Sequence, residues 1–351
     1  MKIAPIIHAL EKRKAAGGHL RYRLVHTGQH YDAKMSGDFF TQLNIPAPDV
    51  NLEVGSGTQA EQTAAIMTRY EKLLIEQRSD VCLVVGDVTS TMACAIAAQK
   101  LCVKVAHVEA GIRSGDWTMP EEINRMVTDS ITNYFFTTSE VANASLRRHG
   151  AAESSIFFVG NTMIDTLLAN MERLKAPPFW SDLGLVAGEY FVVTLHRPAN
   201  VDGSSTFDKM LQAISTATRG MKVVFPVHPR TAKTMRELNS VPPNLLLVEP
   251  LGYLEFNYLV KHAKAVITDS GGITEETTVM GVPCMTLRSS TERPETITMG
   301  TNELLGIDPS ALKPALDRLF AGSWKRGSIP PLWDGHTSER IVKVLESVLV
   351  E

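Results

Sequence analysis

The sequence lacks the features that mark several common classes of protein. It has 4 cysteines in 351 residues, and their spacing matches neither a zinc site nor a disulfide framework. No run approaches the roughly 18 apolar residues of a membrane-spanning helix, and the first apolar stretch leads directly into four charged residues at 11–14. We therefore expect a cytoplasmic protein with buried, reduced thiols at Cys82, Cys94, Cys102 and Cys284.

Charge is also nearly balanced. The chain carries 35 basic and 38 acidic residues, a formal net charge of -3. Because binding a polyanion by counterion release needs an excess of Lys and Arg, this balance argues against nucleic acid as a partner. Any anion-binding site must therefore be local.

Short β-branched runs alternate with segments of helical periodicity along most of the chain, which is typical of β-α-β units around a buried parallel sheet. The predicted elements include strands at residues 21–27, 81–86, 104–108, 134–138 and 155–160 and helices at 59–77 and 338–350. The alternation is interrupted at residues 175–189, where two prolines and two glycines indicate a linker or domain edge. With 44% hydrophobic residues the chain can form two cores. We predict an α/β fold with domains at residues 1–172 and 173–336, followed by a helical segment at 337–351. The chain opens on a helix, with no strand before it.

Acidic residues follow two predicted strands of the first domain. Asp87 comes after residues 81–86 and Glu109 after residues 104–108, at the strand ends where open α/β sheets bind ligands. Glu121 begins the next helical pattern. Singly, Asp87 could cap a helix, Glu109 could pair with Arg113, and Glu121 could favour a helix N-terminus. Together they can converge on one crevice, where like charges raise one another's pKa and divide acid and base roles.

The second domain contains a candidate anion site at residues 269–276. Ser270, Gly271 and Gly272 bring backbone N–H groups to a helix N-terminus, which suits a phosphate. Glu276 lies one turn into the helix and could accept both hydroxyls of a ribose. The alternative is a capped helix with acidic first-turn residues, but two glycines are costly unless a ligand approaches closely.

Two further strand ends of the second domain carry histidine and arginine. His196 and His228 each follow a strand and precede an arginine, a repeated pattern that favours an anionic ligand over two packed histidines. Arg288 and Arg293 follow the last strand, with Glu292 and Glu295 as alternative salt-bridge partners. No carboxylates are spaced with histidines as metal ligands, so we predict neither a metal nor another cofactor.

Seven segments resemble the non-hydrolysing UDP-N-acetylglucosamine 2-epimerases, in the family's order and across almost the whole chain. They are "GDVTSTMACAIAAQK", "AHVEAGIRSGDWTMPEEINR", "FFTTSE", "VGNTMIDTL", "TLHRPANVD", "DSGGITEE" and "TERPET". The resemblance implies two Rossmann-like domains in the glycosyltransferase-B arrangement that close over a UDP-sugar, with the last helix packing back on the first domain. It also implies a homodimer.

The resemblance also assigns residues. It implies catalytic roles for Asp87, Glu109, Glu121 and His196. It implies substrate or UDP binding at Arg113, Ser270, Gly271, Gly272, Glu276 and Arg293, to which the histidine pattern above adds His228. In some bacterial members the pair matching Gln29 and His30 helps to bind a second, activating UDP-GlcNAc, and the residues after that pair diverge here.

The implied reaction is epimerisation at C2 of a UDP-N-acetylhexosamine, UDP-GlcNAc to UDP-ManNAc. UDP is eliminated to leave a 2-acetamidoglucal and then adds again. Four alternatives remain open: a UDP-2,3-diacetamido-2,3-dideoxyglucuronate 2-epimerase, a hydrolysing epimerase, a glycosyltransferase of the same architecture, and a non-catalytic UDP-sugar binder.

The start of the chain departs from the family. Members begin with a strand and a Gly-x-Arg-Pro loop before the equivalent of "KIAP", and this chain has neither. The first strand of the N-terminal domain is therefore missing from the pattern. We expect the chain as given to bind UDP mainly through its second domain and to turn over poorly.

Overall fold

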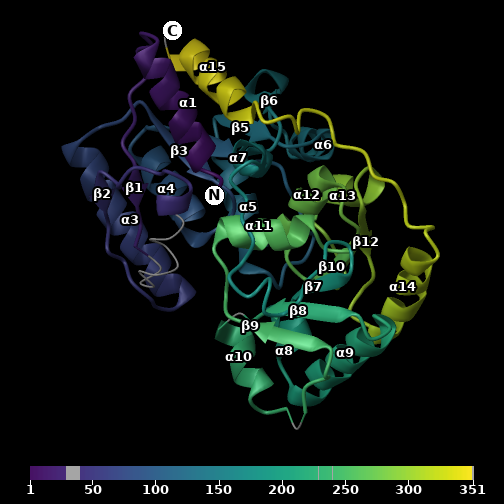
Figure 1. The fold of residues 1–351 in the computed structure, drawn as a ribbon. Helices are drawn as coiled ribbons and strands as arrows, with labels where there is room; N and C mark the ends of the chain where they lie inside the picture. Colours follow the sequence, from purple (N-terminus) through teal and green to yellow (C-terminus); the bar gives the residue numbers. More distant parts are fainter. Residues whose placement is uncertain (29–39, 228, 239, 350–351) are drawn as a thin grey trace. The chain divides into compact units, whose positions relative to one another are not determined.

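The computed structural model describes residues 1–28, 40–227, 229–238 and 240–349. The chain divides into two compact units (Figure 1). Unit 1 comprises Met1–Ala169 and Pro331–Glu351, and unit 2 comprises Asn170–Pro330. Both units contain parallel sheets with helical connections, which confirms the predicted α/β class. The predicted domain limits at residues 172 and 336 remain a prediction about folding units.

Unit 1 is built on a four-stranded parallel sheet in the order β3-β4-β5-β6. The strands are β3 (Val81–Val85), β4 (Lys104–Val108), β5 (Tyr134–Thr137) and β6 (Ile156–Phe158), and the helices between them are α4 (Thr89–Lys100), α5 (Pro120–Ser130) and α6 (Glu140–Arg148). Each of these strands falls within a run that the sequence predicts as a strand. The residues after β3 and β4 lie at the same end of the sheet, because neighbouring parallel strands have their carboxyl ends on the same side.

Helices cover both faces of this sheet. Val84 and Val105 pack with Ile66 of α3 (Gln59–Glu76) on one face. On the other face, Val108 packs with Ile6 of α1 (Ala4–Ala15) and with residues of α15 (Thr337–Leu349), which lies beside α1 (Figure 1). Because both faces are buried, the strands read as continuous apolar runs in the sequence.

The predicted strand at residues 21–27 is much shorter in the structure. It is reduced to β1 (Val25–His26), which pairs with β2 (Val50–Asn51) in a separate two-stranded sheet. The Leu24 N–H donates to the Asp49 carboxylate at 2.7 Å, so a side chain takes the bond that a ladder would use.

The start of α15 and the segment before it are attached to the rest of unit 1 by buried hydrogen bonds. Asp165 of α7 (Thr162–Asn170) accepts the N–H groups of Thr337 and Ser338 at 3.0 and 2.7 Å. The indole of Trp333 donates to the Thr138 carbonyl at 3.1 Å. Gly160 has φ +101, and a Cβ there would lie 2.1 Å from the Leu332 carbonyl oxygen. The end of the chain therefore forms an integral part of unit 1.

Unit 2 contains a six-stranded parallel sheet in the order β12-β11-β10-β7-β8-β9. The strands are β7 (Tyr190–Thr194), β8 (Lys222–Pro226), β9 (Leu245–Val248), β10 (Ala265–Thr268), β11 (Cys284–Thr286) and β12 (Asn302–Leu304). The helices are α8 (Pro198–Val201), α9 (Ser204–Ala217), α10 (Pro229–Met235), α11 (Tyr253–Lys261), α12 (Gly271–Met280), α13 (Pro294–Thr298) and α14 (Leu312–Phe320). The strand order reverses between β7 and β10, and such a switch point is where open α/β sheets bind ligands.

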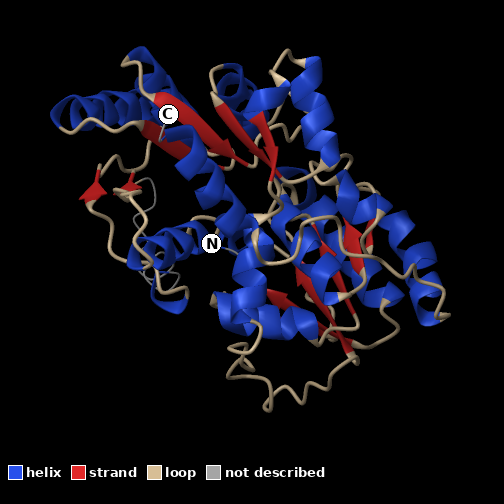
Figure 2. Ribbon diagram, turned by 90° about the horizontal axis from the view of Figure 1, so that it is seen from above, coloured by secondary structure: helices blue, strands red, loops and turns tan. Residues whose placement is uncertain are grey.

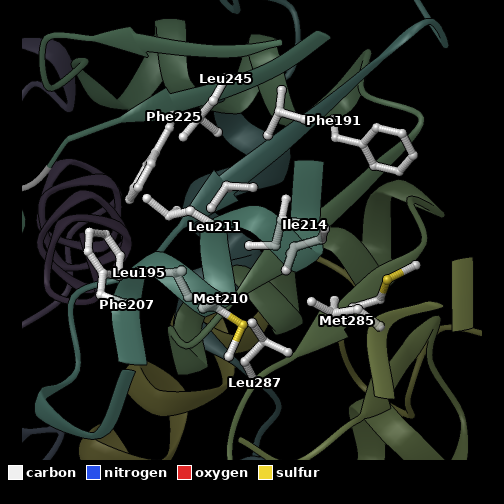
Figure 3. Packing of buried hydrophobic residues seen from close by; sticks show 14 of the residues in the cluster. Phe191, Leu195, Phe207, Met210, Leu211, Ile214, Phe225, Leu245, Met285 and Leu287 are labelled. Atoms are coloured by element: carbon white, nitrogen blue, oxygen red, sulfur yellow. The ribbon is translucent and has the colours of Figure 1, made fainter. Parts of the chain in front are cut away.

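The sheet of unit 2 has helices on both faces (Figure 2). Apolar side chains therefore pack in one layer on each face of the sheet. On one face, Phe191 and Phe225 pack with Leu211 and Ile214 of α9 (Figure 3). On the other face, Tyr190, Val192, Val224 and Val266 pack with residues of α11 and α12. The segment at 175–189 belongs to this layer, since the Trp180 ring lies 5.6 Å from that of Tyr190. It therefore belongs to unit 2, close to where that unit begins at Asn170.

Cysteine burial differs from the prediction at one position. Cys82, Cys94 and Cys284 are buried as expected, but Cys102 is exposed. It lies just after α4, in a turn with φ +56, where its N–H donates to the Gln99 carbonyl at 3.0 Å. Within the described ranges, no helix has the length and apolar character needed to cross a membrane.

Candidate functional site

Asp87 is held at the end of β3 by the helix α5. Its carboxylate accepts a hydrogen bond from Arg125 at 2.5 Å, and its backbone carbonyl accepts one from the Asn124 amide at 2.9 Å. The residue at the N-cap of α4 is Val88, so Asp87 does not cap that helix. The helix-cap alternative is therefore wrong, and Asp87 is a partly exposed carboxylate fixed against a cation.

Glu109 lies at the end of β4 in a conformation that costs energy. Its φ is +70, which is unfavourable for a residue other than glycine, and it is buried. Its carboxylate accepts a hydrogen bond from the Lys2 ammonium at 2.5 Å, and Oε2 would lie 3.9 Å from a Cβ placed on Gly86. The Glu109 carboxylate therefore lies against the residue that precedes Asp87.

Arg113, the alternative partner of Glu109, instead pairs with Asp129 of α5, its Nη1 lying 2.6 Å from Oδ2. Asp129 Oδ1 lies 2.7 Å from Nδ1 of His107, whose Nε2 lies 2.8 Å from the Gly86 carbonyl oxygen. Burial would raise the pKa of Asp129, but the hydrogen bond from His107 and the charges of His107 and Arg113 bring it below its ordinary value. The sequence indicated neither His107 nor Asp129, since each acts through residues distant in sequence.

The two glutamates at the start of α5 have different surroundings. Glu122 is buried and accepts the N–H groups of Ser114 and Gly115 at 2.9 and 3.0 Å, as well as a hydrogen bond from Arg125 at 2.7 Å. Burial would raise the pKa of Glu122, but these donors lower it. Glu121 is half-buried, and no described residue donates a hydrogen bond to its carboxylate. Of the pair, Glu121 is the carboxylate available to a ligand.

Two of the three acidic residues of unit 1 have cationic partners that the sequence did not suggest. Asp87 is paired with Arg125, and Glu109 is paired with Lys2. Sequence reasoning missed both cations, because Arg125 lies 38 residues from Asp87 and Lys2 lies 107 residues from Glu109.

In unit 2, His196 and Asp269 meet at the switch point between β7 and β10. The His196 ring nitrogen Nδ1 lies 3.0 Å from Asp269 Oδ1. The carboxylate also accepts the backbone N–H of Arg197 at 2.9 Å and the Asn200 amide at 3.0 Å. Burial would raise the pKa of Asp269, but the hydrogen bond and charge of His196 lead the effects that bring it below its ordinary value. Asp269 thus orients His196, whose side chain remains 40% exposed.

The turn after β10 leads into the N-terminus of α12. Ser270 is the N-cap residue, and its side chain makes no capping hydrogen bond, so the capped-helix alternative does not describe it. Glu276 lies farther along α12, buried, with the Asn257 amide 3.5 Å from its Oε1. Burial, with the neighbouring Glu275 carboxylate adding to it, raises the pKa of Glu276 to about 7.

The arginines after β11 form a buried ion network. Arg288 makes two hydrogen bonds to Glu292, at 2.7 and 2.8 Å, which is the salt bridge proposed as the alternative interpretation. Arg293 pairs with Glu275 of α12, a partner that the sequence did not suggest. Burial raises the pKa of Glu295 to about 7, despite the nearby Arg293 charge.

These pKa values predict how stability varies with pH. The folded protein holds protons on Glu276 and Glu295 up to about pH 7, whereas the unfolded chain releases them near the ordinary value of 4.5. Their contribution to stability is therefore fully present below pH 4.5 and is lost as pH rises to about 7. Between these two pKa values, each group lowers the free energy of unfolding by about 1.4 kcal/mol for every unit that the pH rises.

We expect Glu276→Gln to halve the dependence of the free energy of unfolding on pH, because Glu295 alone then titrates with a raised pKa. Urea unfolding followed at several pH values between about 5 and 7 measures both slopes. Wild-type stability that stays flat or increases across this window would contradict the prediction.

Three predicted site residues, Gln29, His30 and His228, lie outside the described residues. Among the others, the Glu109 carboxylate lies close to Gly86, the residue before Asp87. His196 pairs with Asp269, the residue before Ser270. Elsewhere in the described ranges, no group of three or more His, Cys, Asp or Glu side chains is arranged to hold a metal ion.

The sequence profile of the UDP-N-acetylglucosamine 2-epimerases matches residues 11–346 of this chain. The chain belongs to the UDP-N-acetylglucosamine 2-epimerase family. It is therefore an enzyme of the isomerase class, as predicted. The UDP-N-acetylglucosamine 2-epimerase of Methanocaldococcus jannaschii is 40% identical, over 98% of this chain and 95% of that protein.

Solved structures extend this similarity to the fold. A crystal structure of the M. jannaschii UDP-GlcNAc 2-epimerase in complex with UDP-GlcNAc and UDP matches with a TM-score of 0.89, over 99% of this chain and 96% of that one. A second relative, the UDP-2,3-diacetamido-2,3-dideoxy-D-glucuronate 2-epimerase of Pseudomonas aeruginosa, is 38% identical over 81% of this chain and 79% of its own length. This chain therefore has the glycosyltransferase-B class of fold that the solved epimerase structures have.

Proposed function

We propose that this enzyme interconverts UDP-GlcNAc and UDP-ManNAc by inverting C2 of the sugar without a cofactor. The observation that carries the proposal is the pair of strand-end carboxylates, Asp87 and Glu109, each fixed by a cation in a member of the epimerase family. The similarity to the M. jannaschii enzyme along nearly the whole chain supports UDP-GlcNAc as the substrate over the diacetamido-glucuronate.

The reaction needs acid and base groups on both faces of one carbon. A base removes the proton from C2 while the C1–O bond breaks, and the electron pair of that bond leaves with the β-phosphate oxygen of UDP. A C1=C2 double bond forms, giving 2-acetamidoglucal. A proton then reaches C2 from the opposite face as the UDP oxygen attacks C1. Two carboxylates with separate partners can divide these roles.

We assign proton transfer at C2 to Asp87, Glu109 and Glu121. Glu109 is buried, and the hydrogen bond that it accepts from the Lys2 ammonium fixes the position of its carboxylate. Asp87 and Glu121 are more accessible, and α5 carries both Glu121 and the arginine that holds Asp87. Arg113 is proposed as a cationic group that stabilises negative charge on the substrate.

We assign UDP binding to the switch point of unit 2. The N–H groups of Gly271 and Gly272 at the start of α12 suit the pyrophosphate. Ser270 would contribute its hydroxyl, because its own N–H donates to Thr268 Oγ1 at 2.9 Å. Glu276, when ionised, suits the two ribose hydroxyls. His196 and the predicted residues His228 and Arg293 would offset the charge that develops on UDP as it leaves C1.

We predict that Asp269→Asn lowers kcat by up to about 10²-fold, because His196 loses the carboxylate that orients it. UDP affinity is expected to change much less. Steady-state kinetics and calorimetric titration with UDP measure the two effects. Asp182→Asn, at an exposed position of the same unit, is the control. An Asp269→Asn enzyme with wild-type kcat would contradict the role proposed for the pair.

The proposed reaction is tested by incubating the protein with UDP-GlcNAc in deuterated water and following the sugar by proton NMR. We expect UDP-ManNAc to form and deuterium to enter C2. Release of free ManNAc would indicate a hydrolysing enzyme, and UDP-GlcNAc binding without turnover would indicate a non-catalytic binder. A parallel incubation with the diacetamido-glucuronate nucleotide tests the other sugar. The homodimer and the cytoplasmic location stay predictions.

A further inference from the structure

His107 is a buried histidine for which the proposed reaction gives no role. It lies on β4, two residues before Glu109, and is completely inaccessible to solvent. Nδ1 lies 2.7 Å from the Asp129 carboxylate, and Nε2 lies 2.8 Å from the Gly86 carbonyl oxygen. Because the Gly86 carbonyl oxygen can only accept, Nε2 donates to it.

These two hydrogen bonds connect the ends of both strands that carry the proposed catalytic carboxylates. The Gly86 carbonyl precedes Asp87 directly. On the other side, Asp129 accepts the Gly111 N–H at 3.0 Å and the Arg113 guanidinium at 2.6 Å, both in the loop that follows Glu109. A single imidazole ring therefore links the turn after β3 to the loop after β4.

Gly86 has a permissive conformation and contacts β4 at both of its backbone polar groups, because its N–H donates to the Val108 carbonyl at 3.0 Å and its carbonyl accepts from His107. It has φ +75, so the chain turns sharply between β3 and Asp87 at a residue without a side chain. Arg125 and Asn124 fix Asp87 itself, and Asn124 and Arg125 lie on the same helix as Asp129. His107 and α5 thus hold two consecutive residues of the turn.

We propose that His107 is a positioning residue, which fixes the Gly86–Asp87 turn through Nε2 and the Arg113 guanidinium through Asp129. The proposal rests on the proposed function, in which Asp87 transfers a proton at C2. Loss of the link would let the Asp87 carboxylate shift relative to its substrate. A displacement of about 1 Å can cost about 10²-fold in rate.

Two substitutions of His107 test its hydrogen bonds to Gly86 and to Asp129 separately. His107→Asn places an amide near the position of Nδ1, so it retains the contact with Asp129 and loses the one with Gly86. His107→Gln reaches toward the position of Nε2 and can still donate to Gly86. His149→Gln, at an exposed histidine of unit 1 whose Nδ1 lies 2.7 Å from the Ser145 carbonyl oxygen, is the matched control.

We expect His107→Asn to lower kcat by about 10²-fold with little change in KM, and His107→Gln to recover much of that loss. Asp129→Asn should lower kcat as well, and the double variant with His107→Asn should be little worse than either single variant, because the two act as one unit. His107→Asn with kcat within about twofold of wild type, or with a change confined to KM, would overturn the proposal.

Amide hydrogen exchange tests the same link without relying on turnover. We expect the amides of residues 87–89 to exchange faster in His107→Asn than in wild type, and at the wild-type rate in His149→Gln. If the wild-type protein does not epimerise UDP-GlcNAc, the proposed function is wrong. The exchange rates still show whether His107 holds the turn after β3. Unchanged exchange at residues 87–89 in His107→Asn would overturn the proposal.

Discussion

Replacing Glu109 by glutamine is expected to lower kcat by about 10²- to 10⁴-fold, the usual contribution of general acid or base catalysis. Glutamine has nearly the same shape but cannot exchange a proton. The substitution also leaves the Lys2 ammonium, now 2.5 Å from Glu109 Oε2, without its carboxylate partner. Deuterium incorporation at C2 should stop with the same loss, because proton removal and delivery both need a titrating group.

UDP affinity distinguishes this result from general damage. We assign UDP to the N-terminus of α12, so calorimetric titration of Glu109→Gln with UDP should give nearly the wild-type dissociation constant. Glu71→Gln, an exposed position on α3, is the matched control and should keep full activity. If Glu109→Gln retains deuterium exchange at C2, Glu109 is not one of the proton-transferring groups.

Gly160→Ala is expected to destabilise unit 1 by about 4 kcal/mol. An alanine at φ +101 carries backbone strain of about 1–3 kcal/mol, and overpacking adds a similar amount. The added Cβ would lie 2.1 Å from the Leu332 carbonyl oxygen and 2.8 Å from Thr337 Oγ1, so the segment leading into α15 would have to move. Urea unfolding measures the free energy of unfolding.

Gly203→Ala separates the strain from the clash. Gly203 has φ +100, almost the same as Gly160, but nothing lies within 4 Å of a Cβ placed there. Gly203→Ala should therefore cost only the backbone strain. Equal losses in the two variants would show that close packing against Leu332 is unimportant.

Most of the regular structure could be predicted from the sequence, because buried parallel strands are continuous apolar runs and amphipathic helices repeat with a helical period. The helix expected at residues 59–77 is observed as Gln59–Glu76, and the one expected at 338–350 as Thr337–Leu349. The strand at residues 21–27 was overestimated, since Asp49 takes the N–H of Leu24. β2 and β12, of two and three residues, were too short to leave a recognisable pattern.

The site was predictable only in part, for a different physical reason. Residues that follow strands could be picked out from the strand pattern, which is how Asp87, Glu109 and His196 were found. Their partners lie far away in sequence: Lys2 is 107 residues from Glu109, and Asp269 is 73 residues from His196. No local pattern encodes such a contact. Where a local partner was available, as Arg113 was for Glu109, it proved to be the wrong one.

The return of the last helix to unit 1 affects how the protein can be made. The roughly 160 residues of unit 2 are synthesised between the first part of unit 1 and the residues that complete it. At ribosomal rates of about 5–20 residues per second, this takes roughly 10–30 s. During that interval the apolar surface that receives Ile341 and Leu345 stays uncovered on the nascent chain. This surface is where chaperones would act, and a chain that stops before α15 would expose it permanently.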